Sequence, residues 1–371
     1  MKLALIRRRY SAIGGGELYL QRLMGALLTK GHSLHLISES WPSSHASNDN
    51  IEYHQVSACQ SRGERVLHFA RGVEQTLQSL KVDCVFSLER TFQQDIYRAG
   101  DGVHAVWLER QRTFAPVWKK PFCGLGGHHR NVLALERKTL HPSNTRFIIA
   151  NSNMVRNEIV ARFSFPPERI RVIPNGVNLG KFHNVHREQA RTQFGLKPQD
   201  FVLLFVGSGW ERKGLAYSIQ LLRDLQKMEP MLPPPFKSVK LLVVGKGRPP
   251  LFAESGVIYA GPVSEVESAY TAADLLAFLP VYEPAANVVS EALASGLPVL
   301  TTAFNGAAER IVQGENGHVF ASPTQREAIR AAALEWMKRN TRISFAPQQL
   351  SMDRNVEDTL EVISLAIENR P

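Results

Sequence analysis

Residues 275–301 read LLAFLPVYEPAANVVSEALASGLPVLT, and this stretch decides the fold class. It contains a short apolar run at 275–279, a helical pattern at 286–295 and a second apolar run at 298–301. Short apolar runs joined by an amphipathic helix are typical of a strand–helix–strand unit in a parallel sheet. The stretch therefore predicts a doubly wound α/β domain.

The same alternation extends along the rest of the chain. We predict strands at 2–6, 33–37, 84–87, 147–149 and 170–173 and helices at 17–30, 65–80, 131–139 and 154–163. Further strands are predicted at 201–206, 240–244 and 257–259, and helices at 213–227 and 263–271. Pro174 and the Asn175-Gly176 pair break both helix and strand. We therefore expect two Rossmann-like α/β domains, one over 1–175 and one over 176–352.

Length and composition agree with a two-domain globular protein. The chain has 371 residues, of which 44% are hydrophobic and 21% charged, and its apolar runs are strand-length. These values exclude disordered, fibrous and membrane-spanning classes. The short apolar run before Arg7, Arg8 and Arg9 is unlike a secretory signal, so we expect a cytoplasmic protein. Three widely spaced cysteines predict neither disulfides nor a metal site.

The positive charge is confined to one half of the chain. Residues 1–184 carry 25 basic against 14 acidic side chains, whereas residues 185–371 carry 19 against 20. A basic half favours an anionic partner: a nucleic acid, an acidic lipid surface or a phosphorylated glycolipid. Charge alone leaves these three open.

A glycine-rich turn at 13–17 follows the first predicted strand and opens the first predicted helix. Gly15 and Gly16 at such a place let the backbone approach a phosphate at a helix N-terminus. The pattern departs from GxGxxG, and a purely structural turn is the alternative.

A second candidate phosphate site follows the strand at 201–206. There, Arg212 and Lys213 stand at the start of a predicted helix, where two cations can neutralise a diphosphate. Taken alone, the pair is more typical of a solvated face.

The most specific motif holds Glu283 and Glu291, eight positions apart across the turn that opens the helix at 286–295. Backbone N–H groups of 285–287 are expected to point at an anion, while the two carboxylates accept hydrogen bonds from hydroxyl groups. A sugar and a ribose diol would satisfy both carboxylates. A capped helix with two solvated carboxylates is the alternative.

Together, the Glu-x7-Glu segment, the Arg212-Lys213 pair, the sequence IPNGVN at 173–178 and the opening Gly-Gly-Gly-Glu resemble the retaining nucleotide-sugar glycosyltransferases of family 4. The spacing around Asp101 is similar to that of the family members that add glucose to inner-core heptose of bacterial lipopolysaccharide. The resemblance implies the GT-B fold, with two Rossmann-like domains facing across a cleft. It also implies that a C-terminal helix, about 353–371, crosses back onto the first domain.

The resemblance implies a role for each motif residue. Glu283 would hold hydroxyls of the donor sugar, Glu291 the ribose, and Asp101 would lie near the reacting sugar or the acceptor. Arg212 and Lys213 would stabilise the departing diphosphate, so that no metal is needed. The implied catalytic residues are Glu283, Asp101, Arg212 and Lys213, and the implied donor-binding residues are Gly15, Gly16, Arg212, Lys213, Ala286, Asn287, Val288 and Glu291. Ala286 and Tyr19 depart from the family pattern, on the donor and acceptor sides respectively.

Residues 103–130 combine aromatic and basic side chains with a single acid. Aromatic rings favour a lipid headgroup interface, and each nearby Lys or Arg adds about 1 kcal/mol on an anionic surface. We expect this stretch to bind an anionic membrane surface, with core aromatics and solvated charges as the alternative. The set is Trp107, Phe114, Trp118, Phe122, Arg110, Arg112, Lys119, Lys120 and Arg130.

The sequence thus predicts a retaining hexosyltransferase, peripheral on the inner membrane, that moves glucose from UDP-glucose to an inner-core heptose of a lipid-linked glycan acceptor. No cofactor beyond the nucleotide sugar is expected. A family 4 enzyme with another glycolipid or exopolysaccharide acceptor is the first alternative. A basic nucleic-acid-binding protein is the second, although the chain has no recognised nucleic-acid module and no nucleic-acid partner is expected. A dehydrogenase lacks support because GxGxxG is absent.

Overall fold

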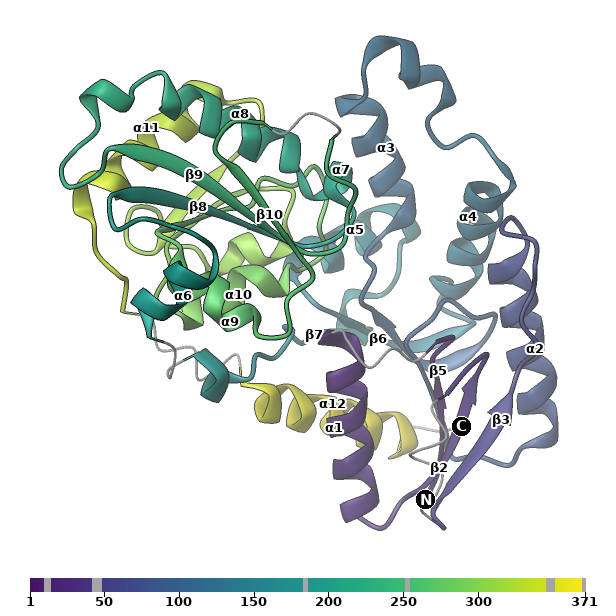
Figure 1. Cartoon of the computed structure of the whole chain (residues 1–371). Helices are drawn as coiled ribbons and strands as arrows, with labels where there is room; N and C mark the ends of the chain where they lie inside the picture. The colour runs from purple at the N-terminus through teal and green to yellow at the C-terminus, as the bar shows by residue number, and fades with distance from the viewer. Residues whose placement is uncertain (10–14, 42–48, 183–185, 251–253, 345–350, 369–371) are drawn as a thin grey trace. The chain divides into compact units, whose positions relative to one another are not determined.

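The computed structural model describes residues 1–9, 15–41, 49–182, 186–250, 254–344 and 351–368. The chain divides into two compact units (Figure 1). Unit 1 comprises Met1–Gly176 and Met352–Pro371, and unit 2 comprises Val177–Ser351. Each unit is an α/β structure around a parallel sheet, so the fold class predicted from the sequence is confirmed.

Unit 1 contains a seven-stranded parallel sheet in the order β3-β2-β1-β4-β5-β6-β7. Its strands are β1 (Lys2–Ile6), β2 (Ser33–Ser38), β3 (Ile51–Gln55), β4 (Cys84–Ser87), β5 (Gln94–Ala99), β6 (Thr145–Ala150) and β7 (Ile170–Val172). Its helices are α1 (Gly15–Thr29), α2 (Arg65–Ser79), α3 (His104–Phe114), α4 (Gly127–Thr139), α5 (Asn153–Phe163) and α12 (Met352–Glu368), with short 3-10 turns η2 (Val117–Phe122) and η3 (Pro167–Arg169).

Helices cover both faces of this sheet because successive side chains of a strand point to opposite faces. Leu3 and Leu5 of β1 pack in the cluster that includes α1 and α12. Ala4 and Ile6 of the same strand pack in the cluster that includes α2. A strand buried on both faces reads as an uninterrupted apolar run, which is how β1 appears in the sequence.

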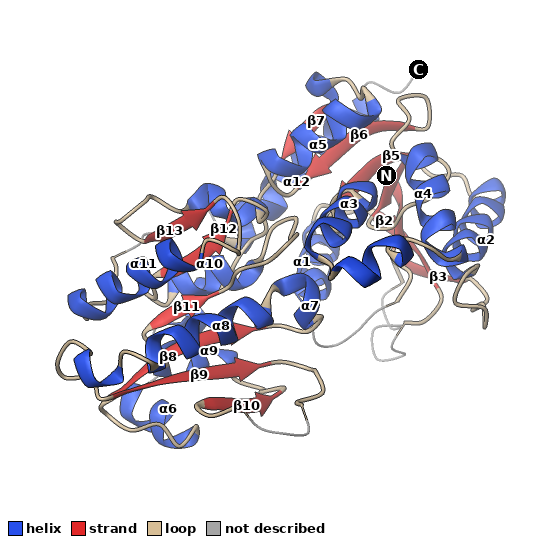
Figure 2. Ribbon diagram, turned by 90° about the horizontal axis from the view of Figure 1, so that it is seen from above, coloured by secondary structure: helices blue, strands red, loops and turns tan. Residues whose placement is uncertain are grey.

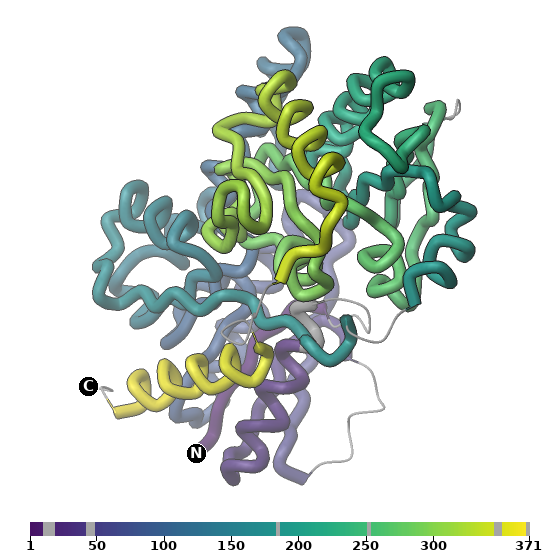
Figure 3. Tube along the Cα trace, turned by 90° about the vertical axis from the view of Figure 1, so that its left-hand side faces the viewer, coloured from purple at the N-terminus to yellow at the C-terminus, as the bar shows by residue number. Residues whose placement is uncertain are grey.

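The last helix, α12, belongs to unit 1 and lies beside α1 (Figure 3). Val356, Val362 and Ile363 share its buried cluster with β1, β2 and β4. Two polar contacts join the helices: Arg22 pairs with Asp353 at 2.9 Å, and the Tyr19 hydroxyl donates to Thr359 Oγ1 at 3.2 Å. The C-terminal segment therefore completes the core that residues 1–38 begin.

Unit 2 contains a six-stranded parallel sheet in the order β10-β9-β8-β11-β12-β13. Its strands are β8 (Asp200–Val206), β9 (Ser238–Val244), β10 (Val257–Gly261), β11 (Leu275–Ala277), β12 (Val299–Thr302) and β13 (Gly317–Phe320). Its helices are α6 (Arg187–Gln193), α7 (Trp210–Lys213), α8 (Leu215–Gln226), α9 (Val266–Ala272), α10 (Asn287–Ala294) and α11 (Arg326–Arg339), with 3-10 turns η4 (Leu179–Phe182), η5 (Glu229–Met231) and η6 (Gly306–Arg310). Figure 2 shows helices on both faces of the red strands.

The structure adds elements that sequence patterns did not predict. Strands β3, β5 and β13 and helices α3, α6 and α11 were missed. The sequence of β5, QDIYRA, is half polar, and β3 reads IEYHQ, so neither gives an apolar run. Helix α3 has no buried residue and reads as a basic aromatic stretch rather than as an amphipathic helix. Strands β3 and β5 and helix α3 take their conformation from pairing and packing within unit 1.

Candidate active site

Arg212 and Lys213 form the end of the single-turn helix α7, which lies between two glycines at positive φ, Gly209 and Gly214. Lys213 runs under Gly207, where a Cβ atom on that glycine would stand 2.7 Å from the ammonium nitrogen. The same ammonium lies 5.9 Å from the centre of the Phe278 ring. The turn therefore holds the lysine in a partly buried position at the carboxyl edge of the sheet.

Glu283 follows β11 and is held by its backbone. Its N–H donates to the Phe304 carbonyl at 2.8 Å, and its own carbonyl accepts from the Gly306 N–H at 2.9 Å. The side chain turns to Arg212, with Oε2 at 2.9 Å from Nη1 as an ion pair. None of the described residues donates an aligned hydrogen bond to this buried oxygen, which leaves it able to accept one from a hydroxyl group.

Arg212 is fixed by the same loop. Its Nη1 donates to the Tyr282 carbonyl at 3.2 Å, and its backbone carbonyl accepts from the Val281 N–H at 3.0 Å. One third of the side chain is exposed, at 33%, so part of the guanidinium faces solvent. The guanidinium is therefore held by protein contacts on one side and accessible to solvent on the other.

Electrostatics place four predicted residues in one cluster within unit 2. Burial lowers the pKa of Lys213, the charge of Arg212 lowers it further, and the carboxylates of Glu283 and Glu291 act in the opposite direction. These interactions require all four charged groups to be close. Two cations and two carboxylates, joined at the carboxyl ends of parallel strands, are suited to an anionic ligand that carries hydroxyl groups.

Glu291 lies on α10 and accepts a hydrogen bond from the Tyr270 hydroxyl at 2.6 Å. Burial raises the pKa of Glu291, while this hydrogen bond and Lys213 lower it. Burial also raises the pKa of the Tyr270 hydroxyl, which therefore stays a donor. The carboxylate is consequently oriented, with one oxygen engaged by Tyr270.

The start of α10 differs from the expectation that backbone N–H groups of 285–287 point at an anion. The Ala286 N–H instead donates to the side chain of Asn305, 3.1 Å away, so that part of the expectation is wrong. Ala286 has φ −69°, which any residue can adopt, and its methyl group packs in the core of unit 2. Asn287 and Val288 open the first turn, where a helix has N–H groups without intrahelical partners.

Asn305 is the residue that sequence reasoning missed here. Its side-chain oxygen accepts from the N–H groups of Ala286 and Ala307, both at 3.1 Å, and its amide donates to Thr301 Oγ1 at 3.1 Å. It is also bridged to Glu283 through the backbone. The sequence shows only an Asn directly before a Gly, which is typical of a turn, and Ala286 lies 19 positions away from it.

Asp101 lies in unit 1, just after β5, with 76% of its side chain exposed. Arg90 stands 3.9 Å away and is itself paired with the buried Glu136 at 3.0 Å. Glu136 also accepts from the backbone N–H groups of His104 and Ala105, which caps α3. Asp101 is thus an open carboxylate next to a fixed buried ion pair.

His104, at the start of α3, contacts His129 with 3.1 Å between Nε2 and Nδ1. Burial, together with the charge of Arg90, lowers the pKa of His104 to about 3. The ring is therefore neutral at physiological pH and can share only one proton with its neighbour.

Helix α1 begins at Gly15, and residues 10–14 of the glycine-rich turn lie outside the described residues. The phosphate-binding role of Gly15 and Gly16 stays a prediction. Tyr19 is buried, its ring lies 3.9 Å from the Arg98 guanidinium, and its hydroxyl contacts Thr359. Tyr19 therefore joins α1 to β5 and α12 as a packing residue.

The basic aromatic stretch 103–130 forms α3, η2 and the start of α4. The large apolar side chains exposed there are Val117, Trp118, Phe122 and Leu125, each more than 60% accessible. Lys119 lies 4.9 Å from the Trp118 ring centre. Trp107 and Phe114, in contrast, are half-buried on α3. The exposed apolar residues therefore gather around η2, which we call the η2 patch. In the described part of the chain, no helix is long and apolar enough to cross a membrane.

Comparison with known proteins defines the class. The family model for Glycosyltransferase Family 4 matches residues 13–181, and the model for Glycosyl transferases group 1 matches residues 200–339. The chain belongs to glycosyltransferase family 4 and has the GT-B fold. It is therefore a glycosyltransferase.

The chain is similar to particular glycosyltransferases over nearly its whole length. The lipopolysaccharide glucosyltransferase WaaG of Escherichia coli (strain K12) is 26% identical over 342 residues, which is 89% of this chain and 87% of WaaG. The crystal structure of WaaG superposes with a TM-score of 0.74 at 25% identity, covering 99% of this chain and 98% of that one. HepE of Anabaena, solved in complex with UDP-glucose, shares the fold at 17% identity with a TM-score of 0.63, covering 98% of this chain and all of HepE, 100%.

Proposed function

We propose that this glycosyltransferase transfers a hexose, glucose, from UDP-glucose to an inner-core heptose of a lipopolysaccharide acceptor, with retention of configuration and without a metal. The likeness to WaaG over most of both chains supports the sugar and the acceptor. The observation that carries the donor assignment is the convergence of Arg212, Lys213, Glu283 and Glu291 in unit 2.

The leaving group sets what the site has to do. As the bond between sugar C1 and the diphosphate oxygen breaks, negative charge grows on the diphosphate, and fixed cations stabilise it most when water is excluded. Lys213 is partly buried and packs against Gly207, and Arg212 keeps one side open for a phosphate oxygen. These two cations supply the charge that a divalent ion supplies in other transferases.

The carboxylates are assigned by their surroundings. Glu283 has a buried oxygen beside Arg212 that no described residue bonds with aligned geometry, and we assign it to hydroxyls of the donor sugar. Glu291 is oriented by Tyr270, and we assign it to the ribose diol. Asn287 and Val288 are assigned to the donor because they lie at the N-terminal turn of α10, where the helix dipole favours an anion. Asp101 in unit 1 is assigned to the acceptor side, where an exposed carboxylate can accept a hydroxyl hydrogen bond.

Two experiments test the donor site. Thermal unfolding is recorded with UDP, UDP-glucose, UDP-galactose, GDP-mannose and ADP; a ligand at about 100 times its Kd adds about 2.7 kcal/mol of stability. We expect uridine nucleotides alone to stabilise the chain.

Turnover of labelled UDP-glucose is then compared among Glu283→Ala, Arg212→Ala and the control Arg223→Ala, which breaks an exposed ion pair with Glu254 in the same unit. Normal turnover in Glu283→Ala would refute its assigned role.

The acceptor side involves a membrane surface in this proposal. The η2 patch combines exposed apolar side chains with Lys119 and Lys120, a composition that favours an anionic lipid interface. Flotation with anionic vesicles should retain the wild-type chain at low salt and lose the Trp118→Ser/Phe122→Ser variant. Met231→Ser serves as the control because Met231 is exposed to a similar degree, at 72%, in unit 2. Equal flotation of all three chains would contradict this role of the patch.

A further inference from the structure

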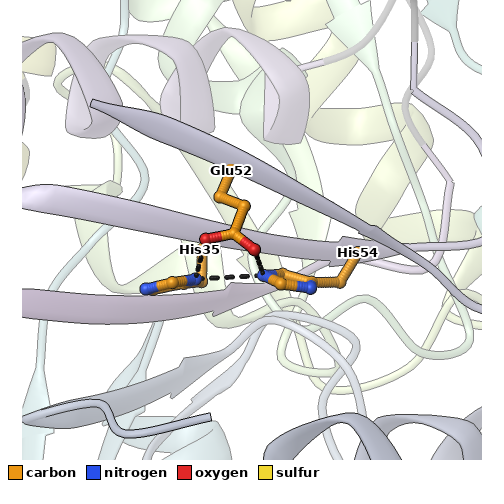
Figure 4. Close-up of side chains that lie close together, drawn as sticks. All are labelled: His35, Glu52 and His54. Atoms are coloured by element: carbon orange, nitrogen blue, oxygen red, sulfur yellow. Dashed lines mark hydrogen bonds and ion pairs between the residues drawn. The ribbon is translucent and has the colours of Figure 1, made fainter. Parts of the chain in front are cut away.

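Three potential metal ligands meet on β2 and β3 of unit 1 (Figure 4). His35 is on β2, and Glu52 and His54 are on β3, which is the edge strand of the sheet. The parallel register pairs His35 with Glu52, and Ile37 with His54. Side chains alternate along a strand, so all three ligands lie on one face of the sheet.

The distances among the three ligand atoms are those of a coordination site. His35 Nδ1 lies 3.0 Å from His54 Nε2, and the Glu52 carboxylate oxygens lie 3.4 Å from His35 Nδ1 and 3.5 Å from His54 Nε2. With bonds of about 2.0–2.1 Å to Zn²⁺, neighbouring ligand atoms are roughly 2.9 Å apart at right angles and roughly 3.4 Å apart in a tetrahedron. The three observed distances, 3.0, 3.4 and 3.5 Å, span nearly the same range.

The orientation of the side chains agrees with this. In Figure 4 a nitrogen of one ring faces a nitrogen of the other, and the carboxylate turns one oxygen to each of these two nitrogens. Two ring nitrogens at this distance share at most one proton, so the hydrogen bond between them leaves the carboxylate only partly paired. A cation at the centre of the triangle would satisfy all three groups at once.

We propose that His35, Glu52 and His54 bind one divalent transition-metal ion, with Zn²⁺ as the best match to two imidazoles and one carboxylate, and that water completes the coordination. Glu52 has 64% of its side chain exposed, which opens the site to solvent, whereas His35 is buried. The bound ion would cross-link the edge strand β3 to β2 and protect the sheet edge.

The cluster is unrelated to the donor site, which lies in unit 2, so the proposal does not depend on the function proposed above. Sequence spacing gave no sign of it, because the ligands come from two strands that are 17 residues apart at the paired positions 35 and 52. No metal ligands were expected from the sequence, and pairing of β2 with β3 is what assembles them.

The experiment is calorimetric titration of the full chain, freed of metal with a chelator, with ZnCl₂. We expect one ion per chain. Loss of an outer-shell partner of a metal ligand costs about 10- to 100-fold in affinity, so Glu52→Gln and His54→Gln should weaken binding at least as much. His141→Gln, an exposed histidine elsewhere in unit 1, is the matched control and should leave binding unchanged. Circular dichroism checks that each variant is folded.

A second readout identifies the ligands. Co²⁺ bound in place of Zn²⁺ should give visible absorption bands in the wild-type chain that disappear in Glu52→Gln and His54→Gln. Zinc should also raise the thermal unfolding temperature of the wild-type chain and not of these variants. Absence of binding, or equal affinity in wild type and both variants, would overturn the proposal. Loss of binding in Cys59→Ser or Cys123→Ser but not in the His and Glu variants would likewise overturn it by assigning the ion to a thiol.

Discussion

Replacing Gly207 by alanine should slow the transferase more than it destabilises the fold. The new Cβ atom would stand 2.7 Å from the Lys213 ammonium nitrogen and 2.8 Å from its Cδ. Reaching an ordinary contact of 3.4 Å requires the lysine to move by about 0.7 Å. A misplacement of roughly 1 Å in a catalytic group can cost about 100-fold in rate, so we expect kcat/KM to fall about 10- to 100-fold.

The backbone also contributes a cost that must be separated from this effect. Gly207 has φ +142°, a conformation that favours glycine, so the alanine variant should lose about 1–3 kcal/mol of unfolding free energy. Gly209→Ala is the matched control: this glycine has φ +71° in the same loop, but nothing lies within 4 Å of its added Cβ atom. It should be destabilised in a similar way while keeping its rate within about threefold, because Lys213 is not displaced.

The assay is steady-state transfer from labelled UDP-glucose, normalised to the folded fraction, together with the Kd of UDP from calorimetry. A double variant, Gly207→Ala with Lys213→Ala, completes a thermodynamic cycle. If the alanine acts by displacing the lysine, it should have little further effect once the lysine is absent. Equal rate losses in Gly207→Ala and Gly209→Ala, or full additivity in the double variant, would refute the reasoning.

Three further predictions concern residues around the candidate site. Asn305→Ala leaves two buried backbone N–H groups without their acceptor, so it should lower the unfolding free energy by about 2–5 kcal/mol, measured by chemical denaturation. Tyr19→Phe removes only the hydrogen bond to Thr359 and should cost about 1 kcal/mol in the same assay, with no change in turnover. Burial lowers the pKa of His104 to about 3, below the 6.5 of the unfolded chain, so the unfolded state binds the proton first and stability should fall as pH drops from about 6.5 towards 3. His104→Asn should flatten that fall, and an unchanged pH profile would contradict it.

The α/β class could be predicted because strands buried on both faces are apolar throughout. Every residue of β8 is buried, and its sequence, DFVLLFV, shows it directly. Edge and half-polar strands lack this signal. Pairing with neighbouring strands stabilises the extended conformation of β3 and β5, and a local sequence pattern does not reveal that pairing.

The residue types of the candidate site could also be predicted, since cations and carboxylates at strand ends have a chemical reason to be there. The residues that hold these side chains in place could not be predicted. Tyr270 reaches Glu291 across 21 positions, and Asn305 reaches Ala286 across 19, each from a different element. For Ala286 the prediction was wrong. Its backbone N–H was expected to face a ligand, but it donates to the side chain of Asn305 in the same unit.

From the amino-acid sequence we could predict the fold class, the restart of the α/β pattern near residue 176, and the charged motifs of a glycosyltransferase. These depend on periodicity and on residue chemistry, which are local properties of the chain. The tertiary structure alone shows that Tyr19 packs between α1, β5 and α12, and that His35, Glu52 and His54 form one cluster. Such contacts arise because parallel strands and packed helices bring distant positions together. Their energy depends on several segments at once, so no single segment predicts them.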